Sequence, residues 1–265
     1  MKNCAYCKED RPLTREHVIP SFIYNFQKRN GEKQIGWNEI IGKMVGGEAK
    51  IRDVCSECNN GSLGSLDRYG KELLSQSGVL VKNYLKQSLQ LHYDYDLLLR
   101  WVLKISFNSS RIDGAHRHLF EPFIPFILHG RPRPERNQIG LVAYLASPIE
   151  TKTVSEETRP YIYLAEDSEF FNPFFMRISY GHAPGLKNLT LRIVSFGPLY
   201  FLMPIFDQGV LHGHAASSIR RLVKISKGAV KLCPSKYFSQ LKAGEYSWLQ
   251  LYEHQVLRSK TLESY

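Results

Sequence analysis

The sequence predicts an α+β fold, in which a small cysteine-bearing module precedes a helical segment and an antiparallel β-sheet domain. Three observations support this. Two Cys-x-x-Cys pairs, Cys4/Cys7 and Cys55/Cys58, bracket the start of the chain. Apolar residues then recur at helical spacing over 71–130. Short β-rich segments separated by turn residues follow over 138–206.

The chain has 265 residues, enough for one domain or two. We expect a module over 1–70 and an α+β domain over 71–265. The second domain should be helical over 71–130, mainly antiparallel β over 138–206, and helical again in its tail. The sequence Gly-Arg-Pro-Arg-Pro at 130–134 cannot form regular structure and is the best candidate for a boundary.

Within the module, local patterns indicate alternating strand and helix. Val18 and Ile19 favour extended chain, and Pro20 ends it. A short helix is expected over 21–29, a loop or irregular hairpin over 30–47, and a strand over 50–54 that leads into the second cysteine pair. The chain should turn helical after Cys58.

In the rest of the chain, helical spacing covers Leu80, Val81, Tyr84 and Leu85, and again Leu98, Trp101, Val102 and Ile105. These are read as core positions. Five segments read as strands. They are 139–145, 161–165, 175–180, 189–196 and 199–206. A polar loop is expected over 151–160, a helix over 217–225, and mixed structure over 238–257.

The charge is the main clue to a partner. The formal net charge is +10, which favours an anionic partner and, most plausibly, nucleic acid. Residues 1–70 contribute only +2 of it, so phosphate contacts should draw on the rest of the chain. A basic surface that only aids solubility is the alternative.

No apolar run approaches the roughly 18 residues of a membrane span. The early cysteine pair argues against a secretory signal, so a cytoplasmic location and no membrane partner are expected.

Cysteine spacing indicates a metal centre. Paired Cys-x-x-Cys turns typify tetrahedral zinc sites, and four thiolates leave no open position on the ion. We therefore expect Cys4, Cys7, Cys55 and Cys58 to hold a structural Zn²⁺. Cys233 is interpreted as a spectator thiol.

The residues between and beside the cysteine pairs resemble a known family. The sequence Glu16-His17-Val-Ile-Pro is followed by Cys55-Ser-Glu-Cys58-Asn-Asn. This combination resembles HNH endonucleases, the ββα-metal or His-Me finger group, in the subset with a Cys4 zinc on a treble-clef-like scaffold. The resemblance covers residues 1–70 only.

The resemblance implies a site. His17 matches the general base that activates the attacking water. Glu16 matches the carboxylate that binds the catalytic divalent cation, Mg²⁺ or Mn²⁺, and Asn59 matches the second protein ligand. The products would carry 5′-phosphate and 3′-hydroxyl ends.

The motif departs from the family pattern in two ways. Glu16 stands where aspartate is usual. The middle asparagine that orients the base has no counterpart, and Asp53 or a backbone carbonyl is the candidate to replace it. Asn60 is an alternative to Asn59 as ligand, and is otherwise a helix cap or DNA contact; for Asn59 itself the alternative is a cap.

Candidate nucleic-acid contacts are mostly arginines. They are Arg15, Arg52, Asn60, Arg131, Arg133, Arg136, Arg220, Arg221 and Lys224. For the six that follow Asn60 in this list, from Arg131 to Lys224, a basic surface that is simply solvated is an equally good interpretation. The pairs His116/His118 and His212/His214 lack acidic or cysteine partners nearby and are read as ordinary histidines.

The sequence therefore predicts a metal-dependent HNH-type endonuclease that acts on DNA in preference to RNA. A role in restriction or phage defence and a homodimer are both compatible with it. One rival is a zinc-stapled nucleic-acid-binding protein without catalysis. A second is a protein-interaction scaffold, for which DNA affinity would depend little on salt.

Overall fold

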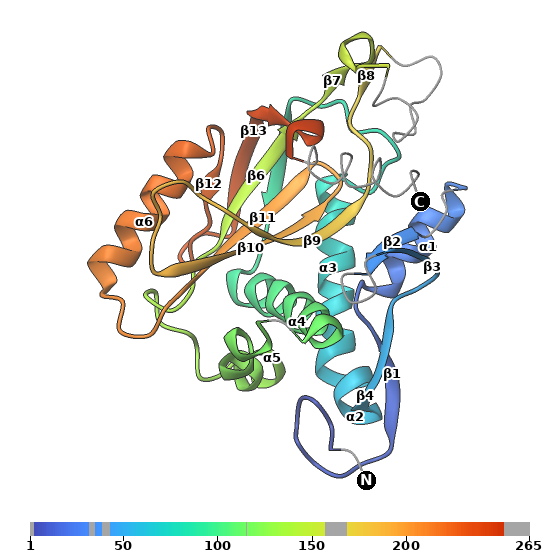
Figure 1. Cartoon of the computed structure of the whole chain (residues 1–265), viewed down its shortest axis with the longest axis vertical. Helices are drawn as coiled ribbons and strands as arrows, with labels where there is room; N and C mark the ends of the chain where they lie inside the picture. The colour runs from blue at the N-terminus through green and yellow to red at the C-terminus, as the bar shows by residue number, and fades with distance from the viewer. Residues whose placement is uncertain (1–2, 32–34, 39–42, 115, 157–168, 252–265) are drawn as a thin grey trace.

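The first part of the chain is built on one antiparallel strand pair. The structure is a computed structural model and describes residues 3–31, 35–38, 43–114, 116–156 and 169–251 (Figure 1). The elements of the first part are, in chain order, β1 (Leu13–His17), α1 (Ser21–Arg29), β2 (Ile35–Asn38), β3 (Lys43–Gly46), β4 (Lys50–Cys55), α2 (Ser56–Cys58), the single wider helical turn η1 (Asn59–Leu63) and α3 (Gly64–Ser77). β1 pairs with β4 and β2 pairs with β3.

Local sequence predicts these elements well. The helix expected over 21–29 is α1, with the same bounds, and Pro20 precedes it as its N-cap residue. The strand expected over 50–54 is β4. The expected irregular hairpin contains the β2–β3 pair, of which only the backbone is described.

The second part forms a seven-stranded sheet with helices on both faces. Its elements are β5 (Ser88–His92), α4 (Tyr95–Asp113), η2 (Arg117–Leu119), η3 (Glu121–Phe123), α5 (Ile124–His129), β6 (Val142–Ser147), β7 (Ile149–Glu150), η4 (Thr151–Thr153), β8 (Phe170–Phe171), β9 (Met176–Gly181), β10 (Leu189–Phe196), β11 (Leu199–Phe206), α6 (His212–Ile225), β12 (Val230–Lys231) and β13 (Phe238–Ser247). The strand order is β5-β13-β6-β11-β10-β9, with β12 paired to β6.

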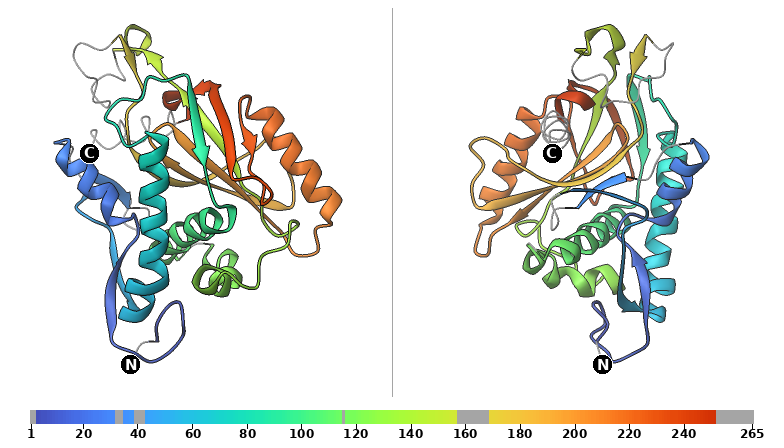
Figure 2. Two further views of the ribbon diagram at one scale, coloured as in Figure 1. Left: turned by 180° about the vertical axis from the view of Figure 1, so that it is seen from behind. Right: turned by 45° about the vertical axis from the view of Figure 1, so that its right-hand side comes forward.

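Alternation along the strands sends apolar side chains to two separate cores. Ala143 and Leu145 of β6 join the core under α4, while Val142 and Tyr144 join the core under α6. Figure 2 shows α3 and α4 on one side of the sheet and α6 on the other. A sheet covered on both faces explains why β11 is buried along its whole length.

Trp101 of α4 ties the first part of the chain to the sheet. Its ring is fully buried and stacks between Phe22 of α1 and Phe196 of β10. α3 can approach this indole only because residue 70 is glycine: a Cβ at Gly70 would lie 2.1 Å from the Trp101 ring. Buried residues from both sides of residue 70 therefore share one core, and the predicted boundary after residue 70 falls inside α3.

Several expectations differ from the structure. The helix expected around 80–85 is wrong, because the chain there leaves α3 at Gly78 and runs irregularly into strand β5. The tail is only partly helical, since α6 is followed by the ten-residue strand β13. The sheet is mixed, because β13 pairs in parallel with β6. The strand expected over 161–165 lies outside the described residues.

Other expectations of secondary structure are confirmed. Strands β10 and β11 have the expected bounds, and β6 and β9 overlap their predicted segments. α6 contains the helix expected over 217–225. None of the described helices is both long and apolar enough to span a bilayer.

Candidate functional site

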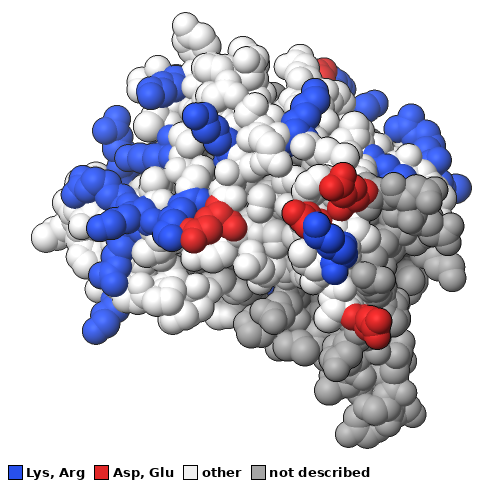
Figure 3. Space-filling model, turned by 90° about the horizontal axis from the view of Figure 1, so that it is seen from above, with Lys and Arg blue, Asp and Glu red and all other residues white. Residues whose placement is uncertain are grey.

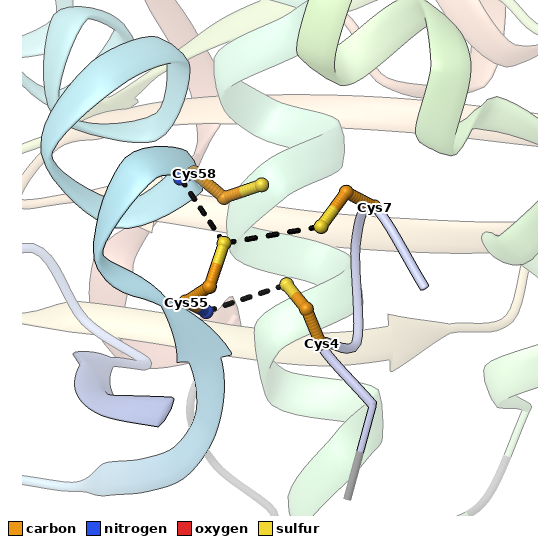
Figure 4. A group of neighbouring side chains, drawn as sticks. All are labelled: Cys4, Cys7, Cys55 and Cys58. Atoms are coloured by element: carbon orange, nitrogen blue, oxygen red, sulfur yellow. Dashed lines mark hydrogen bonds between the residues drawn. The ribbon is translucent and has the colours of Figure 1, made fainter. Parts of the chain in front are cut away.

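Four cysteines at one end of the β1–β4 pair, where β1 begins and β4 ends, lie side by side. Cys4 and Cys7 come from the turn before β1, Cys55 is the last residue of β4, and Cys58 ends α2 (Figure 4). Their four Sγ atoms all lie within 4.8 Å of one another. Among the described residues they form the one group of three or more Cys, His, Asp or Glu side chains that can hold a metal ion.

The geometry of this cluster fits a tetrahedral thiolate site. A Zn–S bond of 2.3 Å implies sulfur–sulfur separations of about 3.8 Å, and Cys7 Sγ lies 3.8 Å from Cys55 Sγ. The backbone N–H groups of Cys55 and Cys58 point at sulfur, with donor distances of 3.3 Å to Cys4 Sγ and 3.5 Å to Cys55 Sγ. The cluster can therefore bind a metal such as zinc.

The acid–base properties of the thiols agree with a metal role. Burial raises the pKa of Cys4, but backbone N–H groups, led by that of Cys55, outweigh it and lower this pKa to about 7. Burial and neighbouring thiols raise the pKa of Cys58. Without a cation, then, one of these thiols loses its proton readily and the other does not. A divalent cation would remove this difference, because it stabilises all four thiolates together.

Glu16 and His17 are neighbours in β1 and face opposite ways. Strand residues alternate sides, and the main-chain pairs are Glu16 with Ile51 and His17 with Lys50. Glu16 is 4% exposed, whereas the His17 side chain is 25% exposed. The Glu16 carboxylate therefore lies in the interior of the protein, and the His17 imidazole lies at its surface.

Inside the protein, Glu16 is part of an ion-pair network. Its Oε1 lies 2.8 Å from Nζ of Lys104, a residue of α4 that is itself only 1% exposed. Lys104 Nζ also lies 2.6 Å from Asp67 Oδ2 on α3. Burial lowers the pKa of Lys104, but Asp67 and Glu16 outweigh it and raise this pKa, so the ammonium stays charged.

Asn108, one turn further along α4, holds the same strand. Its Nδ2 donates to Glu16 Oε1 at 3.0 Å and to the His17 carbonyl at 2.9 Å. Its Oδ1 accepts from the Tyr6 hydroxyl at 2.6 Å. A third α4 residue, Arg111, donates to Asn108 Oδ1 and pairs with Asp53. Asp53 is thus engaged by Arg111, and the structure shows no contact between it and His17.

On the surface, His17 is held by a residue that the sequence reading missed. His17 Nε2 lies 2.8 Å from Glu48 Oε2, and Lys50 Nζ lies 2.7 Å from the same oxygen. Contacts with Lys50 and His17 lower the pKa of Glu48. The Tyr24 hydroxyl accepts a hydrogen bond from the backbone of Ala49 and so fixes this turn. The signal available in the sequence was the position of Glu48 just before β4, the partner strand of His17.

The outer face of the β1–β4 pair is basic. Arg15 and Arg52 are paired across the two strands, as are His17 and Lys50. Arg15, Lys50 and Arg52 are exposed. The structure therefore gathers two of the predicted nucleic-acid contacts, Arg15 and Arg52, on one face with His17.

Asn59 is turned toward β1. Its Nδ2 donates to Thr14 Oγ1 at 2.9 Å and to the Arg15 carbonyl at 3.1 Å. In the described part of the chain, the contacts of Glu16 and Asn59 are with other groups and not with each other. Asn60 Nδ2 donates to Ser56 Oγ at 2.9 Å, a contact between two side chains and not a helix cap, in which a side-chain oxygen accepts from a backbone N–H.

The remaining candidates lie elsewhere. Arg133 pairs with Asp96 and covers the Tyr95 ring, while Arg131 is exposed. Arg220, Arg221 and Lys224 are exposed on α6, on the far side of the sheet from α4. Neither predicted histidine pair belongs to a group of metal-binding side chains in the described ranges. Cys233 stands apart from the four-cysteine cluster.

Comparisons with known proteins give no independent guide: no family model, no curated protein and no solved structure matches this chain.

Proposed function

We propose that the protein is a metal-dependent endonuclease of the HNH type, which hydrolyses phosphodiester bonds of DNA with His17 as general base. The observation that carries the proposal is the outer face of the β1–β4 pair. There His17, held by Glu48, is flanked by exposed basic side chains of both strands. The order of two antiparallel strands followed by α3, with the four cysteines at its base, also supports it.

The Glu48 contact suits His17 to accept a proton. A carboxylate beside Nε2 favours the tautomer that carries its hydrogen there, which leaves the lone pair on Nδ1. Among the described residues, Nδ1 of His17 has no hydrogen-bond partner. A water molecule on that side can be deprotonated as it attacks phosphorus, an effect worth roughly 10²–10⁴ in rate.

The neighbouring cations serve the substrate. A phosphodiester repels nucleophiles because its oxygens are negative, and positive groups close to it offset that charge. Arg15, Lys50 and Arg52 lie along the face that presents His17. They therefore support both binding of the phosphate backbone and its orientation toward the base.

The bound zinc is proposed to act only on structure. Four thiolates complete a tetrahedral site, so no position remains for water or phosphate. The cluster joins the turn before β1 to the end of β4. It thus holds in place the strands that carry His17 and its basic neighbours.

A catalytic Mg²⁺ or Mn²⁺ stays part of the proposal, with Glu16 and Asn59 as its predicted ligands. The contacts of Glu16 do not fit that role. Lys104 and Asn108 take up Glu16 Oε1, and a buried ammonium beside a carboxylate opposes a second cation there. The Asn59 amide nitrogen makes two hydrogen bonds to β1, which leave its oxygen, the atom that would ligate a cation, unused by any described residue. No step is therefore assigned to a cation held by these two residues.

A second basic surface supports binding of a long polyanion. α6 contains no acidic residue and exposes Arg220, Arg221 and Lys224. Figure 3 shows Lys and Arg side chains gathered at the end of the molecule where α6 lies. The choice of DNA over RNA rests on the family resemblance alone.

The experiment is nicking of supercoiled plasmid by zinc-loaded protein, with and without added Mg²⁺ or Mn²⁺. The wild type should nick only with added cation, and His17→Ala should not nick. His118→Ala is the matched control, because His118 is exposed and far along the chain from the proposed site. Nicking by His17→Ala at the wild-type rate would overturn the assignment of the base.

A zinc-stapled nucleic-acid-binding protein without catalysis is the second candidate, and the Glu16–Lys104 pair favours it. This function needs the basic faces and the four cysteines but no divalent cation. It predicts salt-dependent DNA binding and an absence of nicking under every metal condition, including by the wild type.

A further inference from the structure

A cleft between α1 and α3 has a lining suited to a nucleotide. It has a volume of about 420 Å³, within the usual range of small-ligand sites. The lining residues are Phe22, Phe26, Arg29, Asn30, Lys71, Ser75 and Leu80. None of these described lining residues is acidic, so the cleft combines aromatic surface with positive charge.

The two aromatic rings are fixed from behind. Phe22 stacks against Trp101 with ring centroids 6.4 Å apart, and Phe26 meets Phe174 edge-on at 4.8 Å. Both are partly exposed where they line the cleft. A rigid, half-exposed ring is the type of surface on which proteins stack unpaired bases.

Within the described ranges, the charged residues of the cleft have no acidic partner. Arg29 and Lys71 are exposed, and no ion pair of either is found among the described residues. Arg29 makes one hydrogen bond, to the Asn25 carbonyl at 3.3 Å. Arg29 closes α1 and Lys71 lies within α3, so their cations reach the cleft from both walls.

Asn30 adds a donor that the protein leaves unused. Its Nδ2 is enclosed and makes no hydrogen bond with any of the described residues, although Asn30 lines the cleft. Buried amide groups are nearly always paired, because an unpaired donor loses its hydration without compensation. If the Asn30 side chain turns toward the cleft, an acceptor on a ligand, such as a base carbonyl or a phosphate oxygen, would satisfy it.

We propose that this cleft binds one unpaired nucleotide, with the base against Phe22 and Phe26 and the phosphate between Arg29 and Lys71. The inference deepens the proposed nuclease function and rests on it, since α1 begins four residues after His17. It assigns to that function a substrate with at least one unstacked nucleotide near the cut.

The test measures binding apart from cleavage. All variants are made in a His17→Ala background, and a fluorescent single strand is titrated by anisotropy without added divalent cation. Arg29→Ala/Lys71→Ala should weaken binding about tenfold and reduce the salt slope by about 1.4. Phe22→Leu, which keeps an apolar side chain, should also weaken binding by about tenfold.

The control removes the same charge from the same helices. Lys28→Ala/Arg68→Ala alters two exposed residues of α1 and α3 that do not line the cleft. We expect a change of no more than about twofold. Equal losses in the two double variants would overturn the proposal, because general attraction would then explain the binding.

Two further arms identify the source of the nucleotide. Displacement of the strand by free nucleoside monophosphates assigns the cleft to a free nucleotide, and its absence assigns it to a nucleotide within a strand. Both results support nucleotide binding, provided that Arg29→Ala/Lys71→Ala is defective. If that variant binds normally while wild-type protein still nicks plasmid, the cleft proposal fails and the nuclease proposal survives.

Discussion

Glu16 and His17 are adjacent in sequence yet bind opposite parts of the protein. Glu16 Oε1 lies 2.8 Å from the buried Lys104 ammonium, and His17 Nε2 lies 2.8 Å from Glu48 Oε2 at the surface. Asn108 links the two, since it contacts the Glu16 carboxylate and the His17 carbonyl. The interior network thus fixes the strand that presents the proposed base.

Removal of His17 should abolish cleavage and spare the fold. His17→Ala should lower the nicking rate roughly 10²–10⁴-fold, because the variant loses the imidazole that takes a proton from the attacking water. No other described group that contacts Glu48 is placed to replace it as the base. Zinc content and the thermal midpoint should stay close to the wild type, since the side chain is partly exposed. Zinc loss together with activity loss would instead point to a structural role for His17.

Glu48 should contribute stability that depends on pH. Lys50 and His17 lower its folded-state pKa, so its contribution is present above the ordinary glutamate pKa and is lost as pH falls through the lower folded value. In urea unfolding at neutral pH and at about pH 3, Glu48→Gln should lose less stability on acidification than the wild type. Equal losses in both proteins would contradict the pairing.

Glu48→Gln should also slow nicking at neutral pH. A neutral amide binds the imidazole less strongly than a carboxylate and can present either donor or acceptor to it, so the required tautomer is less favoured. We expect a loss of about tenfold, smaller than that of His17→Ala. A nicking rate equal to that of the wild type would remove Glu48 from the mechanism.

The Lys104 network should be costly to break from one side. Lys104→Met leaves the Glu16 and Asp67 carboxylates facing each other without a cation, which should destabilise the fold by about 3–5 kcal/mol. Adding Glu16→Gln should recover part of this loss, because one uncompensated charge is removed. Chemical unfolding of both variants and of Glu16→Gln completes a double-mutant cycle; a coupling near zero would contradict the observed contact.

Metal removal should disrupt the first part of the chain. Cys58→Ser should lower the zinc content of protein loaded with zinc, measured with a colorimetric chelator, and lower the thermal midpoint. Cys4, Cys55 and Cys58 belong to the same buried core as Trp101, so the damage should spread beyond the turn. Cys233→Ser is the matched control and should keep both zinc and stability. Equal zinc contents in the two variants would exclude Cys58 as a ligand.

The basic face of α6 should contribute to DNA affinity. Arg220→Ala/Lys224→Ala removes two charges one helical turn apart and should reduce the salt slope for duplex binding by about 2. The control is Lys152→Ala/Lys227→Ala, whose side chains already pair with Glu150 and Glu245. An unchanged slope in the α6 variant would leave that face as a solvated surface.

Sequence reading succeeded where local chemistry decides structure. The spacing of the cysteine pairs identified the four-cysteine cluster that can hold a metal, and Pro20 with the apolar spacing after it gave α1 its bounds. It failed at 80–85, where apolar residues at helical spacing lie in irregular chain before β5. It also missed β13, which alternates between exposed and buried residues only over 238–242 and pairs with strands far away along the chain. Strand pairing across such separations leaves little local signal.

Local sequence alone established that four thiols come in two chelating pairs, that Pro20 closes the segment carrying Glu16 and His17, and that the chain carries a large positive charge. Only the tertiary structure decided which way each side chain of that segment faces and what it meets there. Lys104 reaches Glu16 from a helix 88 residues later in the chain, and Glu48 reaches His17 through the pairing of β1 with β4. Such contacts depend on burial and on strand register, which are properties of the folded chain as a whole.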